Sequence, residues 1–127
     1  MLLVSGCNED MSIEQPTYAR ISQDSVRVQV KLDASKAALI RDEEIYLTVT
    51  ALECGSGGGR YPAEAFVGNE EVSAFDFPVT GKNVSFHGDI PIEVFERYEK
   101  PCVVLEGGSY LGRTVSTKPT PIEPEPQ

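Results

Sequence analysis

Strict alternation of apolar and polar residues is the feature that most restricts how this chain folds. In the stretch SVRVQVKLD, residues 25–33, every second residue from Val26 to Leu32 is apolar and the residues between are polar. Side chains of a β-strand point alternately to its two faces, so this period of two predicts a strand with one buried face. The stretch EIYLTVTALEC, residues 44–54, is apolar on both faces, which predicts a central strand.

Further strands are predicted from shorter runs with the same period. Their apolar residues are Phe75, Phe77 and Val79 in one run, Val84, Phe86 and Ile90 in the next, and those of CVVLE and YLGRTVS near the C-terminus. Turn sequences separate the runs: CGSGGGRYP, VGNEE, TGKN and EGGSYLG. About seven short strands at this spacing predict an all-β fold, a β-sandwich with at most one or two short helical turns.

Two segments have helical character. The stretch SKAALIRDEE predicts one turn of helix with Ser35 as its N-cap. The stretch PIEVFERYEK, residues 91–100, supports two alternatives. It places glutamates four residues before cations and Pro91 near a helix start, but its apolar alternation also continues the preceding strand, with Pro91 at an edge or a break. The sequence does not decide between helix and strand here.

The charge of the chain restricts its partners. The 127 residues carry 11 Lys and Arg against 20 Asp and Glu, a net charge of −9, and the acidic residues are spread along the chain. Phosphate binding requires clustered cations, so nucleic acid is not an expected partner. No apolar run reaches the roughly 18 residues that cross a bilayer.

Both ends of the chain differ in composition from the middle. Residues 18–117 hold the alternating runs and form the predicted sandwich domain. Residues 118–127 contain four of the nine prolines, which predicts an extended, disordered tail that acts as a spacer. Residues 8–17, NEDMSIEQPT, are polar and predict a flexible tether.

The tetrad Val4-Ser5-Gly6-Cys7, behind a short apolar run, resembles the lipobox of bacterial lipoproteins. The resemblance implies that a signal peptidase cuts before Cys7, whose thiol then carries a lipid. Residues 1–17 would then comprise a truncated signal remnant, the lipidation site and the tether. Asn8 in place of aspartate after the cysteine implies the outer membrane rather than the inner membrane of a bacterial envelope.

The chain has three cysteines, an odd number that needs explanation in an exported protein. If Cys7 carries the lipid, Cys54 and Cys102 remain to form a disulfide. The alternative is a pair of reduced, buried thiols in a cytosolic protein. Cys54 ends an early predicted strand and Cys102 opens a late one, an arrangement that resembles bacterial immunoglobulin-like domains. The chain lacks the core tryptophan of antibody domains, and this resemblance implies an architecture without functional residues.

The sequence offers little for catalysis. His87 is the single histidine, so it alone could serve a serine–histidine–aspartate triad; Asp89 could orient it, but no serine is marked as a nucleophile. The acidic run at residues 42–44 lacks the spacing of a calcium loop, and CGSGGGR lacks the ending of a phosphate loop. We therefore expect no enzyme activity, no metal and no cofactor.

The expected function is binding of another envelope protein by a domain held to the membrane through Cys7. Loops on a rigid scaffold carry recognition, and the loop at residues 55–62 offers Arg60 and Tyr61, two residue types common at binding hot spots. Two alternatives remain open. One is an inhibitor or exclusion factor against a cationic envelope hydrolase, a phage or a toxin. The other is a structural accessory subunit of an envelope assembly. The oligomeric state is not predicted.

Overall fold

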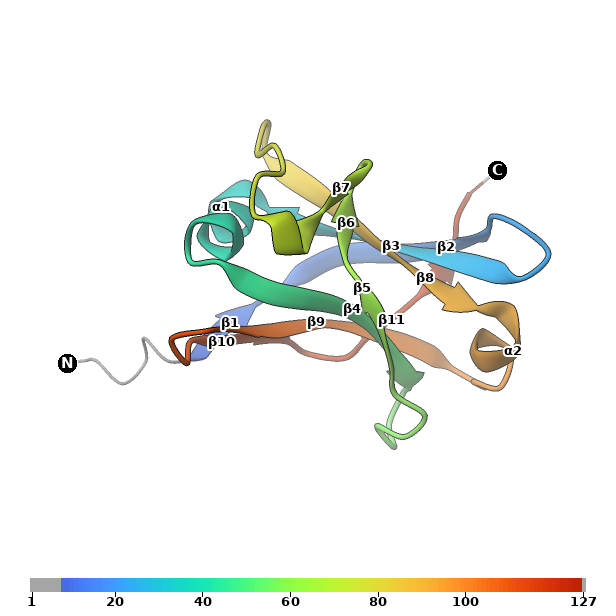
Figure 1. Ribbon diagram of the computed structural model, residues 1–127. Coiled ribbons are helices and arrows are strands. Elements are labelled where there is room, and N and C mark those ends of the chain that lie inside the picture. Colours follow the sequence, from blue (N-terminus) through green and yellow to red (C-terminus); the bar gives the residue numbers. More distant parts are fainter. Residues whose placement is uncertain (1–7, 127) are drawn as a thin grey trace.

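The computed structural model describes residues 8–126, which form two β-sheets and two α-helices. The sheets lie face to face, with one helix near each end of the long axis (Figure 1). This arrangement confirms the prediction of an all-β sandwich. Cys7, the predicted site of the lipid, lies outside the described residues.

The first sheet has the strand order β1-β10-β9-β4-β5, and β11 also pairs with β9. Its strands are β1 (Asn8–Met11), β4 (Ile45–Glu53), β5 (Tyr61–Glu64), β9 (Pro101–Ser109), β10 (Thr114–Thr117) and β11 (Thr120–Pro121). The prediction of a central strand at β4 is confirmed, because β4 lies between β9 and β5.

The second sheet has the order β12-β2-β3-β8-β6-β7. Its strands are β2 (Ile13–Arg20), β3 (Ser25–Asp33), β6 (Phe66–Val67), β7 (Glu70–Glu71), β8 (Asn83–Pro91) and β12 (Glu123–Pro124). The runs β2-β3-β8-β6 and β5-β4-β9-β10 follow the A-B-E-D and C′-C-F-G strand orders of immunoglobulin-like sandwiches. The resemblance to that architecture therefore extends to the order of the strands.

The core fills the space between the two sheets. Alternate residues of β3 face inward and are fully buried or nearly so, as the period of two predicted. At Gly88 on β8 the two sheets pack tightly together: a Cβ atom there would lie 2.8 Å from Cβ of Val49 and 3.1 Å from Cβ of Ala63. Only a residue without a side chain fits at that point, because packed interiors have no room for an added methyl group.

Helix α1 (Ala34–Asp42) connects the two sheets between β3 and β4. It is longer than the single turn predicted, and its N-cap is Asp33 rather than Ser35. The Asp33 carboxylate accepts hydrogen bonds from the backbone N–H and the hydroxyl of Ser35. These bonds lower the pKa of Asp33 and satisfy one of the free N–H groups at the helix start. The predicted N-cap, Ser35, therefore lies two residues too far along the chain, within the first turn of the helix.

The alternatives for residues 91–100 are resolved by the structure, because strand β8 ends at Pro91 and helix α2 (Ile92–Phe95) follows directly. The prediction of a strand through Phe75, Phe77 and Val79 is wrong. A 3-10 helix, η2 (Val72–Ala74), ends there at Phe75 in the left-handed conformation, and residues 75–82 form no strand. Phe77 is fully buried beside Phe86, with ring centroids 5.7 Å apart.

A disulfide joins Cys54 and Cys102, as predicted. It links the end of β4 to the start of β9, which are neighbouring strands of the first sheet. On the outer face of that sheet, Leu52, Cys102 and Val104 form a small second hydrophobic cluster with Cys54 packed against it. The disulfide therefore stabilises one end of one sheet and does not cross the core as in antibody domains.

Both end segments belong to the sandwich, which corrects two predictions. Residues 8–17, predicted as a flexible tether, pair in β1 and β2 with β10 and β3. The tail, predicted to be disordered from residue 118, pairs through β11 with β9 and through β12 with β2, and Ile122 between them is buried. Each end segment thus passes from the first sheet to the second.

Candidate functional site

The single histidine lies on the outer face of the second sheet. The His87 ring stacks on Phe66 with centroids 5.6 Å apart. On the neighbouring strand the Arg27 guanidinium donates two hydrogen bonds, 2.8 and 3.1 Å long, to the Asp89 carboxylate. Burial, together with the Arg27 charge, lowers the pKa of His87. The hydrogen bonds from Arg27 lower the pKa of Asp89. His87 is therefore neutral at pH 7, and Asp89 is engaged by Arg27.

The hollow around His87 is small, about 160 Å³, and its lining carries no nucleophile. The lining residues are Arg27, Phe66, Gly68, Asn69, His87 and Asp89. A hydrolytic triad needs a hydroxyl or thiol within hydrogen-bond reach of the imidazole. None of the six lining residues supplies a hydroxyl or a thiol.

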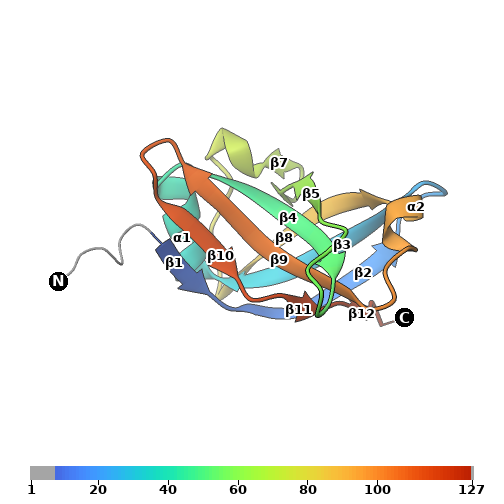
Figure 2. The same cartoon turned by 90° about the horizontal axis from the view of Figure 1, so that it is seen from below.

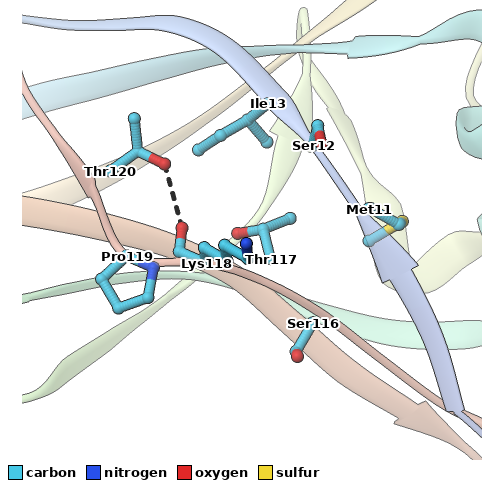
Figure 3. Close-up of a pocket in the computed structure, with 8 residues that line it drawn as sticks. All are labelled: Met11, Ser12, Ile13, Ser116, Thr117, Lys118, Pro119 and Thr120. Atoms are coloured by element: carbon cyan, nitrogen blue, oxygen red, sulfur yellow. Dashed lines mark hydrogen bonds between the residues drawn. The ribbon is translucent and has the colours of Figure 1, made fainter.

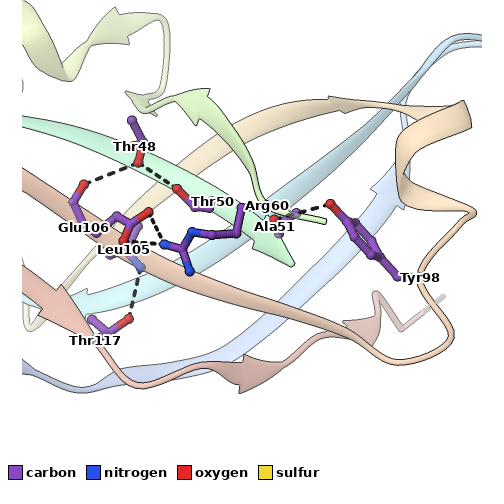
Figure 4. A network of polar contacts seen from close by, with 8 residues as sticks. All are labelled: Thr48, Thr50, Ala51, Arg60, Tyr98, Leu105, Glu106 and Thr117. Atoms are coloured by element: carbon purple, nitrogen blue, oxygen red, sulfur yellow. Dashed lines mark hydrogen bonds and ion pairs between the residues drawn. The ribbon is translucent and has the colours of Figure 1, made fainter. Parts of the chain in front are cut away.

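The glycine loop, residues 55–60, is folded back onto the outer face of the first sheet. The Glu53 N–H donates to the Gly58 carbonyl at 2.9 Å, and the Gly57 N–H donates to the Glu53 carbonyl at 3.1 Å. The Arg60 guanidinium binds both carboxylate oxygens of Glu106 on β9 at 2.6 Å (Figure 4). This loop is therefore held at several points.

Arg60 and Tyr61, the predicted binding residues, occupy different environments. Arg60 is exposed but bound to Glu106, beside the Thr48 and Thr50 hydroxyls of β4, which lie 2.8 Å apart (Figure 4). Tyr61 begins β5 and packs against the core, half-buried. The structure thus leaves Arg60 accessible to a partner and makes Tyr61 mainly a packing residue.

Tyr98 joins the glycine loop to the connection between α2 and β9. Its hydroxyl proton is shared between the carbonyl of Ala51, at 3.3 Å, and the carbonyl of Gly59. Burial and the nearby Glu53 carboxylate raise the pKa of Tyr98, so the phenol remains protonated and able to donate. The same Glu53 carboxylate accepts the N–H groups of Glu99 and Lys100 at 2.9 and 2.8 Å. The two carbonyls bound by Tyr98 and the two N–H groups bound by Glu53 therefore hold the α2–β9 connection against β4 and the glycine loop.

Two shallow grooves lie on either side of α2 and share Tyr98. The first, about 380 Å³, is lined by Tyr18, Arg20, Val26, Ile92, Phe95, Glu96, Tyr98, Glu99 and Pro101. The second, about 350 Å³, is lined by Glu53, Ser56, Gly58, Gly59, Val94, Arg97 and Tyr98. Aromatic rings form the floor of the first groove: Tyr18 contacts Phe95 at 4.7 Å between centroids, and Phe95 contacts Tyr98 at 6.2 Å.

We call this region the distal end: the glycine loop (55–60), α2 with the connection to β9 (92–100), and the β2–β3 turn (21–24). Figure 1 shows α2 and the β2–β3 turn at the end opposite to α1 and the β9–β10 turn. The sequence identified only the loop of this region. The sequence did not predict a role for Tyr98. Its hydrogen-bond partners are backbone carbonyls of Ala51 and Gly59, which lie far from it in the chain and come close only in the folded protein.

A hollow of about 680 Å³ opens between the link from β1 to β2 and the link from β10 to β11 (Figure 3). It is lined by Met11, Ser12, Ile13, Ser116, Thr117, Lys118, Pro119 and Thr120. Short polar side chains and backbone dominate it, with Lys118 as its one charged residue. The Thr120 hydroxyl donates to the Lys118 carbonyl at 2.9 Å, and the Thr117 hydroxyl accepts the Leu105 N–H at 3.0 Å. These hydrogen bonds tie Thr117 of β10 to β9 and hold the link between β10 and β11, so the Thr117 and Thr120 hydroxyls already have partners within the protein.

Within residues 8–126, no cluster of three or more histidine, cysteine or acidic side chains has the arrangement of a metal site. In the same part of the chain, neither helix has the length and apolar character needed to span a bilayer. Comparison with protein-family models, with curated proteins and with solved structures finds no match.

Proposed function

We propose that this chain is a non-catalytic protein-binding module of a bacterial cell envelope, held to a membrane by a lipid on Cys7, with its distal end as the recognition surface. The proposal takes the anchor from the lipobox-like tetrad Val4-Ser5-Gly6-Cys7. The observation that carries the recognition surface is the fixed glycine loop beside the two grooves that share Tyr98.

The physical argument concerns the entropy lost on binding. A loop that becomes ordered on binding loses conformational freedom, and this loss subtracts from affinity. Here the disulfide, the Arg60–Glu106 ion pair and the Tyr98 hydroxyl already hold the loop. Aromatic and arginine side chains at a preordered surface are the common composition of binding hot spots. Exposed Arg97 and half-buried Tyr98 therefore offer a partner a surface that needs little rearrangement.

A structural accessory role through strand addition has less support. Adding a strand requires a long, open sheet edge. The strands of the described sheets that have a single neighbour are β1, β5, β7, β11 and β12, which have four residues or fewer and carry prolines or acidic residues. Such edges discourage pairing with another chain.

The proposal is tested by crosslinking in the native envelope. A photo-reactive residue replaces exposed Arg97 in one variant and exposed Lys31, on the outer face of the second sheet, in a control variant. We expect Arg97 to yield a discrete crosslinked partner and Lys31 to yield none. Equal products at both positions would contradict a distal recognition surface.

The partner is then purified and its affinity is measured. Arg97→Glu should weaken binding by about ten-fold or more if Arg97 lies at a hot spot. Lys31→Glu makes the same change of charge and should leave affinity unaltered. Affinity that falls steeply with added salt would favour the alternative of an inhibitor acting on a cationic protein, because screening weakens attraction between opposite charges.

A further inference from the structure

The turn between β9 and β10 exposes two large apolar side chains. Tyr110 and Leu111 are each 95% exposed. The turn itself is well ordered by hydrogen bonds: the Ser109 N–H donates to the Arg113 carbonyl at 2.7 Å, and the Gly112 N–H donates to the Ser109 carbonyl at 3.1 Å. The Arg113 N–H also donates to the Ser109 hydroxyl at 3.0 Å. Tyr110 and Leu111 are therefore presented outward by a closed turn.

Exposed apolar residues concentrate at this end of the sandwich. Four large hydrophobic residues in the described chain are exposed: Ile21, Tyr46, Tyr110 and Leu111. Tyr46 pairs with Gly108 in the strands that lead to the turn and is 56% exposed, whereas Ile21 lies in the β2–β3 turn at the distal end. Single exposed apolar side chains are common on protein surfaces, but adjacent ones at a turn indicate contact with a nonaqueous partner.

The register of β1 places the start of the described chain at the same end. β1 runs parallel to β10, and Asn8 is the Cα partner of Thr114, which follows the turn by one residue. Figure 2 shows β1 and the start of β10 side by side at the end away from α2. The described chain therefore begins at the same end of the sandwich as the β9–β10 turn.

We propose that Tyr110 and Leu111 enter the interfacial layer of the phospholipid bilayer that carries the lipid on Cys7. The inference rests on the proposed lipid anchor. Leucine side chains favour the boundary of the acyl chains, and tyrosine favours the headgroup level, where its ring is shielded and its hydroxyl stays hydrated. Two points of contact, the lipid and the turn, would fix the tilt of the domain and direct the distal end away from the membrane.

Charges near the turn indicate which lipid composition the turn would bind. Arg113 is paired with Glu43 at 3.2 Å and Arg41 with Asp42 at 3.0 Å, and exposed Glu44 also lies at the end of α1. These carboxylates are repelled by a strongly anionic surface. The contact is therefore apolar in origin, and a zwitterionic phosphatidylcholine bilayer is the matching probe.

The chain contains no tryptophan, so a single introduced tryptophan reports on one position. Leu111→Trp is compared with the matched control Ile21→Trp at the distal end. With the disulfide intact, Cys7 is the one free thiol, and it is coupled to a maleimide lipid in phosphatidylcholine vesicles. We expect tryptophan at position 111 to shift its emission to shorter wavelength and to be quenched by brominated lipids, and tryptophan at position 21 to do neither.

A second measurement avoids the substitution. In the natural sequence coupled through Cys7, hydrogen exchange at residues 110–113 should slow on vesicles, while exchange at residues 21–24 should not. Equal quenching at both tryptophan positions, or unchanged exchange in the turn, would overturn the proposal. Slowing that depends on protein concentration in vesicle-free solution would also overturn it, because the turn would then bind a second copy.

These results are independent of the native anchor. The chemical coupling supplies a lipid whether or not the cell attaches one, so a negative result concerns the turn alone. Mass spectrometry of the cellular protein tests the anchor separately.

Discussion

At the scale of single residues, backbone geometry decides where small side chains are required. Gly107 on β9 is the strictest position: a Cβ atom there would lie 1.9 Å from the carbonyl oxygen of Tyr46 on the neighbouring strand. At Gly108, the next residue, the nearest atom would be the Arg113 carbonyl oxygen at 3.3 Å. The sequence EGG predicts a turn. Only the pairing of β4 with β9 shows that Gly107 has no space for a side chain, whereas Gly108 has more.

We expect Gly107→Ala to lower the free energy of unfolding by about 1–3 kcal/mol or more, because the strand must move to admit the methyl group. Gly108→Ala is the matched control and should cost less. Urea denaturation of both variants measures the difference. Equal stabilities would show that the backbone relaxes without cost at Gly107.

His87 predicts a pH dependence. Its folded-state pKa is lowered by burial, so the unfolded chain binds a proton at a higher pH than the folded chain does. The contribution of His87 to stability is therefore complete above its unfolded pKa of about 6.5 and falls as the pH drops from there to the folded value. In His87→Gln, the stability difference between pH 7.5 and pH 5 should be smaller than in the natural chain. Denaturation at both pH values tests this, and an unchanged difference would exclude His87 as its source.

At the scale of elements, alternation predicted the long strands well. Residues 25–33 and 45–53 form β3 and β4, and Val84, Phe86 and Ile90 lie on β8, because each strand buries one face or both. The pattern failed at Phe75–Val79, where apolar residues pack individually from a loop. A period of two over so few residues arises both in strands and in loops that anchor on a core.

The tail also shows where composition misleads. The high proline content predicted that the tail is extended and solvated. Residues 120–121 and 123–124 instead pair with the sheets, and Pro121 and Pro124 lie on these short strands. Their single apolar neighbour, Ile122, is 5% exposed. One buried residue among residues 118–126 leaves no periodic signal, so the docking of the tail was not predictable from the sequence.

Ile122→Ala should therefore destabilise the domain by about 2–4 kcal/mol, as for other buried isoleucines. Glu123→Ala, which alters an exposed neighbour in the same segment, should change stability by less than about 0.5 kcal/mol. Thermal or urea unfolding of the two variants distinguishes them. A silent Ile122→Ala would mean that the tail contributes nothing to the fold.

The disulfide is a second element whose contribution is measurable. Cys54 and Cys102 are 48 residues apart, and closing a loop of that length stabilises the folded chain by about 4 kcal/mol in the chain-entropy model. The Cys54→Ser/Cys102→Ser variant should unfold at correspondingly lower denaturant concentration. It should also release the glycine loop, detected as faster hydrogen exchange at residues 55–60. Slow exchange retained there would show that Arg60 and Tyr98 suffice.

At the scale of the whole molecule, the expected state is an anchored, oxidised domain. Intact mass spectrometry of the protein expressed from its native locus and extracted from membranes should show a lipid-sized increment on an N-terminal Cys7. Reduction should then add the mass of two hydrogens. An unmodified N-terminus would contradict the proposed anchor while leaving the disulfide prediction intact.

The sequence thus predicted the class of the fold and its disulfide, and it directed attention to one loop of the candidate surface. It could not predict the rest, because the grooves around α2 arise from contacts between residues such as Tyr18 and Phe95 that are far apart in the chain. Strand periodicity is local information, whereas a surface depends on which elements become neighbours.

The parallel pairing of β1 with β10 has a mechanical consequence. A load between a partner at the distal end and a membrane at the N-terminal end would run along the strands. It would pull β1 lengthwise past β10, so the four residue pairs from Asn8–Thr114 to Met11–Thr117 would share the force. Hydrogen bonds between strands lie across that direction and must break together, in shear, instead of opening one at a time. A tether attached before β1 would therefore resist tension, whereas an unpaired N-terminal segment would extend under the same force.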